Sequence, residues 1–155
     1  MKISSPAFEN QGKIPAKFTC DGENISPELI FSAVPESTVR LALIMDDPDI
    51  PDFVKKERGI EVFDHWIVFN MPAETQGIKE GQIAPGVTGL SSRGTKEYVG
   101  ACPPDKEHRY FFKLYALDKE LDLDENNTRA QLAQAMQGHV IEQAELIGLY
   151  ERKSK

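Results

Sequence analysis

The segment VRLALIMDDPDIP, residues 39–51, joins an apolar run to a cluster of acids and prolines. Residues 41–45 include no polar side chain, which is typical of a central strand covered on both faces. Pro48 and Pro51 lack a backbone N–H group, and each disfavours helical backbone in the residue before it. We therefore expect a buried strand over residues 39–45 that ends in a stiff, acidic turn. Any tight turn can use such residues, but this one also delivers carboxylates to one place.

Similar runs recur along the chain, separated by prolines and other turn residues. Short strands alternating with turns are typical of a β-sandwich or barrel. The other expected strands are Leu29–Phe31, His65–Asn70, Tyr110–Leu117 and, more weakly, Ile147–Tyr150. The sequence therefore predicts a mostly β fold.

A late segment, residues 127–145, has a different character. Asn127 or Thr128 can cap a helix, and the residues that follow are good helix formers with an apolar face. Gly138 is expected to break this helix, with a second short helical stretch over residues 139–144. We expect helices only in this late part of the chain. His139 lies away from the other motifs, so we assign it a structural role.

Bulk properties exclude several classes of protein. The 155 residues are 40% hydrophobic and 28% charged, which fits one globular domain over residues 1–155. The formal net charge of -7, with no basic patch, argues against nucleic-acid binding. No apolar stretch approaches the roughly 20 residues that span a bilayer, so stable membrane insertion is not expected. The first residues lack the apolar core of a signal peptide, which predicts a cytoplasmic protein.

Cys20 and Cys102 are the only cysteines. Reducing compartments keep thiols free, so in a protein without an export signal we expect two thiols and no disulfide bond. On this interpretation Cys102 is a small buried side chain.

Two histidines stand at the starts of apolar strands. In FDHWIVFN, residues 63–70, alternation places Phe63 and His65 on one face and Asp64 on the other, so Asp64 is a poor orienting partner for His65. In HRYFFKLYAL, residues 108–117, His108 and Tyr110 share a face. His65 alone could be a satisfied core residue, but the two histidines together with the acidic turn suggest a polar cluster at one edge.

The loop GACPP, residues 100–104, precedes the second histidine. It is rigid and has little side-chain bulk at its start, so a ligand could approach its backbone amides. It could also be a simple proline-rich connection. Upstream, Arg93 and Lys96 could attract anions toward this loop, although solvated loop charges are the simpler interpretation.

Six blocks in order resemble the phosphatidylethanolamine-binding protein family, also called the Raf kinase inhibitor protein family, and most closely its bacterial and archaeal YbhB/YbcL branch. The blocks are FTCDGENISPEL (18–29), DPDIP (47–51), DHWIVFNMP (64–72), GACPP (100–104), HRYFFKLYALD (108–118) and AELIGLYER (144–152). The resemblance implies a sandwich of two antiparallel sheets in a Greek-key arrangement, with short peripheral helices near the C-terminus. It also implies a small anion-binding pocket at one end of the sandwich.

Position by position, the resemblance assigns ligand-binding roles to Asp47, His65, His108, Tyr110, Phe63, Gly100, Cys102 and Pro103. It assigns supporting roles to Asp49, Pro48 and Pro51, with Asp49 expected to brace the turn. Asp46 receives no role, and alternation should send it to the other face of the sheet. The sequence departs from the family at Glu28, at Phe31 and in a charged loop over residues 52–62, which we expect to be solvated.

The resemblance implies a non-enzymatic binding or regulatory protein without a cofactor or bound metal. Its expected ligands are phosphate, a phosphoethanolamine-like group or acetate, its expected protein partner is a kinase or protease, and relatives suggest a homodimer. We expect Asp47 to raise the pKa of both pocket histidines, so that oxyanion binding weakens above about pH 6.5.

Two alternative functions stay open. A hydrolase could use His65 or His108 as base and Ser91, Ser92 or Cys102 as nucleophile, although no nucleophile elbow is visible. A metal protein could use the two histidines with Asp47 as a facial triad, although no helical metal motif occurs.

Overall fold

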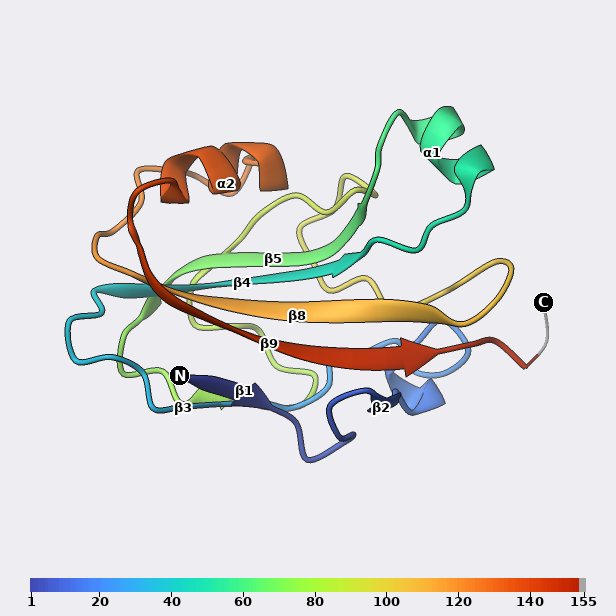
Figure 1. Cartoon of the computed structure of the whole chain (residues 1–155), viewed down its shortest axis with the longest axis horizontal. Coiled ribbons are helices and arrows are strands. Elements are labelled where there is room, and N and C mark those ends of the chain that lie inside the picture. The colour runs from blue at the N-terminus through green and yellow to red at the C-terminus, as the bar shows by residue number, and fades with distance from the viewer. Residues whose placement is uncertain (154–155) are drawn as a thin grey trace.

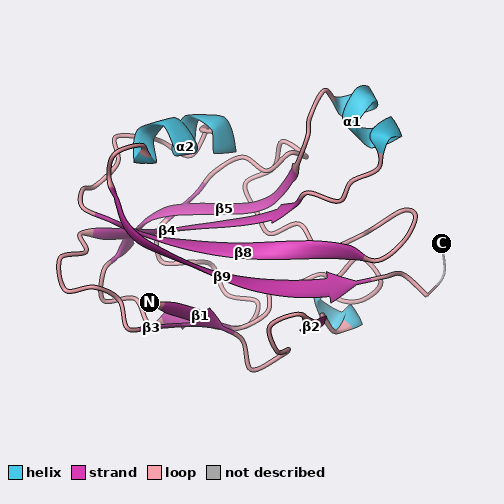
Figure 2. Ribbon diagram, in the orientation of Figure 1, coloured by secondary structure: helices cyan, strands magenta, loops and turns pink. Residues whose placement is uncertain are grey.

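The computed structural model describes residues 1–153, and these form a two-layered β-sandwich (Figures 1 and 2). The elements are β1 (Lys2–Ser4), β2 (Gly12–Lys13), the 3₁₀ helix η1 (Ala16–Phe18), β3 (Leu29–Ser32), β4 (Arg40–Asp47), α1 (Asp52–Arg58), β5 (Phe63–Pro72), β6 (Gly77–Ile78), β7 (Val87–Thr88), β8 (His108–Leu117), α2 (Arg129–Met136) and β9 (Val140–Tyr150). The predicted mostly β fold with two sheets is confirmed.

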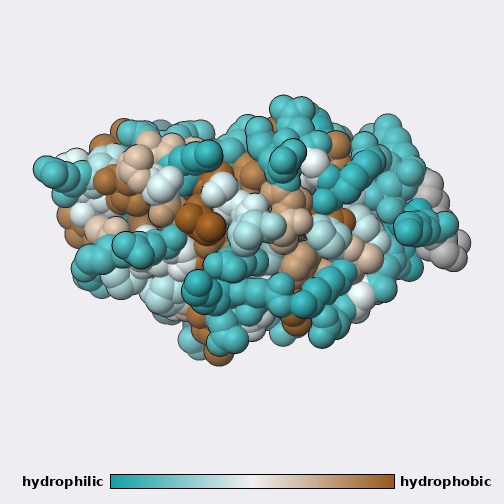
Figure 3. All heavy atoms as spheres, turned by 90° about the horizontal axis from the view of Figure 1, so that it is seen from below, coloured by the Kyte–Doolittle hydropathy of each residue, from teal (hydrophilic) through white to brown (hydrophobic). Residues whose placement is uncertain are grey.

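The large sheet has the strand order β2-β9-β8-β4-β5-β7, and the small sheet has the order β1-β3-β6. The segment β8-β4-β5-β7 is antiparallel, and its fourth strand in the chain lies beside the first, which is the Greek-key arrangement. One pair departs from the expected antiparallel pattern, because β2 runs parallel to β9. The outer face of the small sheet is mainly hydrophilic, with scattered apolar patches (Figure 3).

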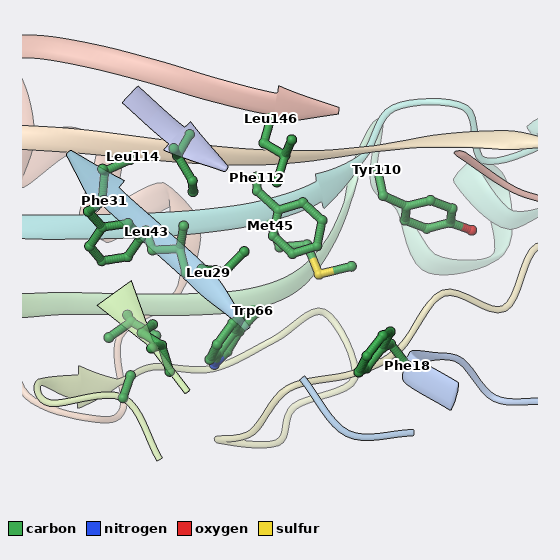
Figure 4. Close-up of a cluster of buried hydrophobic side chains, with 14 of the residues drawn as sticks. Phe18, Leu29, Phe31, Leu43, Met45, Trp66, Tyr110, Phe112, Leu114 and Leu146 are labelled. Atoms are coloured by element: carbon green, nitrogen blue, oxygen red, sulfur yellow. The ribbon is translucent and has the colours of Figure 1, made fainter. Parts of the chain in front are cut away.

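Strand β4 is buried on both faces, as its continuous apolar run predicts. On one face Leu43 and Met45 pack with Trp66 and Phe112 in the core between the sheets (Figure 4). On the other face Ala42 and Ile44 pack against apolar residues of α2. The strand is therefore fixed in register by two cores, since a slip of one residue would exchange its faces.

The structure corrects two helix predictions. The stretch 139–144 is not helical, because β9 begins at Val140 and pairs with β8 along its length. Its Glu, Gln and Ala residues favour a helix, but strand pairing overrides that weak preference. The charged loop 52–62 contains α1, a helix with no buried residue that follows Pro51 and ends at Gly59 in the left-handed conformation. The late helix is observed, with Thr128 and Gln131 forming a capping box.

The two cysteines form a disulfide bond, so the prediction of free thiols is wrong. Cys20 and Cys102 lie 82 residues apart in sequence, and an isolated parallel bridge between Thr19 and Ala101 brings their segments together. The prediction assumed a compartment and ignored proximity. Since disulfides are typical of oxidising compartments, cysteine chemistry no longer supports the cytoplasmic expectation. Among residues 1–153, no helix is long and apolar enough to cross a membrane.

Reduction of this bond should destabilise the protein, because closing a long loop restricts the unfolded chain. Replacing both cysteines by serine is expected to lower the free energy of unfolding by about 2–5 kcal/mol. Denaturant unfolding with and without dithiothreitol measures the effect. The reduced wild type should unfold at the same denaturant concentration as the double variant, and dithiothreitol should not change the unfolding of the variant. If the reductant does not change the unfolding midpoint of the wild type, the assignment of the disulfide bond is contradicted.

Candidate functional site

The predicted site residues meet at one end of the large sheet. Because β4 runs antiparallel to β5 and β8, its end lies beside the beginning of both neighbours: Asp47 pairs with Phe63 of β5, and Asp46 pairs with Phe111 of β8. This end carries α1 in Figure 1. A cavity of about 260 Å³ opens there, and its wall includes all eight residues that the resemblance assigns to ligand binding, together with Pro51.

The lining also contains residues that the sequence analysis did not assign. They are Ile50, Val54, Arg58, Val99 and Pro104. Val54 and Arg58 are four residues apart on α1, so they share one face of that helix. Pro51 before the helix and Gly59 after it are the sequence signals that could have revealed it.

Asp47 is the central buried carboxylate. Its Oδ2 atom accepts a hydrogen bond from His108 Nδ1 at 2.7 Å, and its Oδ1 atom accepts one from the backbone N–H of Asp49 at 2.7 Å. The second bond closes the turn that carries Pro48. Asp47 is therefore held from two sides.

His108 is held between two carboxylates. Besides the bond to Asp47, its Nε2 atom donates to Asp105 Oδ1 at 2.6 Å. A ring that donates from both nitrogens is the imidazolium form. Burial alone would lower the pKa of His108, but the hydrogen bonds and charges of Asp47 and Asp105 outweigh burial and raise it. Asp105, an acid three residues before His108, was missed by the sequence analysis.

His65 has the opposite electrostatic environment. Its Nδ1 atom lies 2.7 Å from the backbone carbonyl of Val99, and its ring contacts those of Phe63 and Tyr110. Burial lowers the pKa of His65 despite that hydrogen bond and the negative charge of Asp47. Asp47 thus acts on both histidines in the expected direction, but a net rise in pKa is found only at His108, because burial outweighs the effect of Asp47 at His65.

Tyr110 places a buried hydroxyl at the pocket. Figure 4 shows this hydroxyl pointing away from the apolar cluster. Among the described residues it has no well-formed hydrogen bond, although the backbone N–H of Cys102 lies near enough to favour its ionised form slightly. Burial dominates and raises the pKa of Tyr110, so the group is a neutral O–H donor.

Two supporting residues lie outside the cavity wall. Asp49 accepts hydrogen bonds from the backbone N–H, Nε and Nη2 of Arg109 at 2.8–2.9 Å, and these bonds lower its pKa. It thereby ties the turn after β4 to the start of β8. Pro48 forms part of the same turn. These positions match a bracing role, since neither residue lines the cavity.

The loop at the mouth is held tightly. The disulfide bond fixes Cys102 to Cys20, whose backbone N–H donates to the Ala101 carbonyl at 3.1 Å. At Gly100 a Cβ atom would lie 2.0 Å from Asn24 Oδ1 and 2.8 Å from the Phe18 carbonyl oxygen. Glycine is therefore required by close packing against the N-terminal segment, and the loop forms a fixed wall.

A second polar cluster lies on the opposite face of the same strands. Asp46, which had no assigned role, forms ion pairs with Lys113 at 2.9 Å and with Arg129 at 3.1 Å. Arg129 also contacts Asp64 at 3.2 Å, and burial raises the pKa of Asp64 to about 6. Asp46 and Asp64 thus fix the start of α2 against the sheet and leave the pocket face to Asp47 and His65.

The geometry weakens both alternative chemistries. Cys102 is in a disulfide, so it has no thiolate to act as nucleophile. Ser91 and Ser92 lie outside the cavity wall, and Ser92 Oγ accepts the backbone N–H of Asp64. A metal triad would require His108 to give up a carboxylate partner.

The remaining charged candidates separate clearly. Arg93 lines the cavity, whereas Lys96 lies outside its wall and pairs with Glu125. His139 lies before β9 and pairs with Asp118, consistent with the structural role assigned to it.

The fold and cavity are those of a β-sandwich protein with a small pocket, of mixed polar and apolar lining, at one end of the large sheet. The family model described as phosphatidylethanolamine-binding protein matches residues 4–151. A UPF0098 protein of Chlamydia pneumoniae is 49% identical over 98% of this chain and 99% of its own, and one of Methanothermobacter thermautotrophicus is 45% identical over the same shares.

Solved structures agree. A putative phosphatidylethanolamine-binding protein homologue from Chlamydia trachomatis superposes with a TM-score of 0.93 at 42% identity, covering 98% of this chain and 97% of that one. YbcL of E. coli, described as a member of the mammalian PEBP family, gives 0.86 at 29% identity over 98% of both chains. The chain belongs to the phosphatidylethanolamine-binding protein family, in its YbhB/YbcL branch.

The pKa of His108 should be shifted upward and that of His65 downward, and Asp105 should account for part of the difference between the two pKa values. NMR titration of the ring signals is expected to place the pKa of His108 above about 6.5 and that of His65 below it. Asp105→Asn removes one carboxylate and should lower the pKa of His108.

The control is Asp118→Asn, which removes the carboxylate beside His139 and should leave His108 unchanged. Because the folded-state pKa of His108 is raised, its contribution to stability is full below about pH 6.5 and is lost as pH rises through that folded pKa. The stability cost of Asp105→Asn should therefore shrink at high pH. If Asp105→Asn leaves the pKa of His108 unchanged, the role of Asp105 in raising that pKa is refuted.

Proposed function

We propose that this protein is a non-enzymatic binding protein whose pocket takes a small oxyanion, either phosphate, a phosphorylated head group or acetate. The observation that carries the proposal is a pair of guanidinium groups on the cavity wall. Arg58 and Arg93 both line the pocket, and neither forms an ion pair with a carboxylate in the part of the chain that the structure describes. In a chain of net charge -7, two unneutralised cations at one cavity favour an anionic ligand.

The size of the cavity limits what it can enclose. At about 260 Å³ it is smaller than the roughly 300–1,000 Å³ of pockets that enclose drug-sized ligands. A phosphate or head group fits this scale, and anything attached to it must leave through the mouth between α1 and the 100–104 loop. Binding to a phosphorylated segment of a protein is one way to use such a site. Modulation of a kinase or protease and homodimer formation stay proposals that rest on family analogy.

The direct test is an NMR titration with phosphate, phosphoethanolamine and acetate, following the three histidine rings. Ligand should shift the His65 and His108 signals, whereas those of His139, at the opposite end of the sheet, should stay in place. No shift of either pocket histidine by any of the three ligands would refute the proposal.

Removing either guanidinium should weaken phosphate binding. Arg58→Gln and Arg93→Gln are each expected to reduce the affinity about fivefold at low salt, with a smaller effect at high salt because ions screen the charge. Calorimetric titration measures the change. The matched control is Arg40→Gln, which removes a cation paired with Glu120 at the other end of β4, about 23 Å along the strand. Equal losses in all three variants would point to net charge alone.

A further inference from the structure

The pocket contains two hydrogen-bonding groups that the protein leaves available. One is the Tyr110 hydroxyl, which is buried without a well-formed hydrogen bond among the described residues. The other is His65 Nε2, which forms no hydrogen bond to any residue in the range 1–153. His108, by contrast, uses both nitrogens on carboxylates. A ligand at the pocket floor therefore meets Tyr110 and His65.

The hydrogen bond at the other side of the His65 ring decides which role Nε2 takes. The Val99 carbonyl can only accept, so Nδ1, at 2.7 Å from it, carries the hydrogen. In a neutral imidazole the second nitrogen then bears a lone pair and accepts. His65 Nε2 is therefore an acceptor whenever the ring is uncharged.

The surroundings of His65 keep the ring uncharged near neutral pH. Its ring lies 4.7 Å from that of Phe63 and 5.3 Å from that of Tyr110, and burial lowers its pKa. Arg93 adds to this effect, while Asp47 on the pocket face and Asp46 on the other face oppose it without reversing it.

We infer that the pocket selects oxyanions that retain a proton: the ligand accepts a hydrogen bond from the Tyr110 hydroxyl and donates its own O–H to His65 Nε2. Arg58 and Arg93 supply positive charge at the wall, which attracts any anion, so the selection lies in the hydrogen bonds. This inference rests on the proposed function and narrows its ligand class. Hydrogen phosphate and singly ionised phosphomonoesters have the required proton, whereas sulfate, phosphodiesters and, near neutral pH, acetate do not, so acetate drops out of the ligand class.

Hydrogen phosphate and sulfate make the sharpest comparison, since they match in size and, at about pH 8, in charge. A sulfate oxygen facing Nε2 would oppose two lone pairs and leave a buried acceptor unsatisfied, which disfavours binding by about tenfold or more. Calorimetric or NMR titration of the unmodified protein at about pH 8 should therefore show phosphate binding at least tenfold tighter than sulfate. Equal affinities would overturn the inference while leaving the proposed function intact. Failure of both ions to bind would overturn the two together.

A second comparison shows which partner carries the proton. A phosphomonoester such as methyl phosphate loses its last proton near pH 6, whereas inorganic phosphate keeps one throughout the range of interest. The affinity for methyl phosphate should fall as pH rises through about 6, and phosphate should continue to bind. A common midpoint for both ligands would place the titrating proton on the protein and overturn the inference.

Two substitutions separate the roles of the two groups. In His65→Gln the side-chain amide can turn an N–H toward the ligand, so the preference for phosphate over sulfate should fall toward one. Tyr110→Phe removes a donor that both ions use, so both affinities should fall while their ratio is kept. The ring signals of His108 and His139 report whether each variant is folded. An unchanged ratio in folded His65→Gln would overturn the assignment to His65.

Discussion

The buried hydrogen bond between Asp47 and His108 is the interaction on which the pocket depends. It joins the end of β4 to the start of β8. The connection from β4 to β5 begins at this hydrogen bond, and the connection from β7 to β8 ends at it. Breaking a buried charged pair by removing one partner costs about 3–5 kcal/mol, because the other charge is left unsatisfied. Asp105 on one side and the Asp49 backbone on the other complete this unit. The protein thus keeps a charged histidine in its interior, while His65 Nε2 and the Tyr110 hydroxyl have no well-formed hydrogen bond to residues 1–153.

The alternation of a β-strand divides consecutive acids between two tasks. Asp46 and Asp47 are neighbours in the chain, yet one anchors α2 through Arg129 while the other builds the pocket. The same division separates Asp64 from His65 on β5. Burial of polar groups on both faces at this end of the sheet is tolerated because each face has counter-charges of its own. A substitution at Asp46 would therefore affect the pocket only indirectly, by changing the position of β4, which carries Asp47.

Short apolar runs separated by turn residues were enough to predict a mostly β fold, and they marked His65 and His108 as candidates because each lies near the start of such a run. The assignment of eight residues to one cavity came from family resemblance, and the structure gathers all eight there. Arg58 was not predicted, since α1 has no apolar face to reveal it. The disulfide was missed because sequence offers no distance between residues 82 apart. The 139–144 stretch was misassigned since its partner strand, not its composition, decides its structure.

The N-terminal segment is joined to β9 by several contacts. β2 pairs with the end of β9, the Met1 ammonium contacts Glu142, and Tyr150 donates a hydrogen bond to Asp21 at 2.5 Å. The large sheet is therefore complete only after β9 has been synthesised and has paired with β8 and β2. Topologies dominated by such distant pairings fold slowly, in milliseconds to seconds. Until β9 has paired, β8 presents an open strand edge, and open edges favour aggregation.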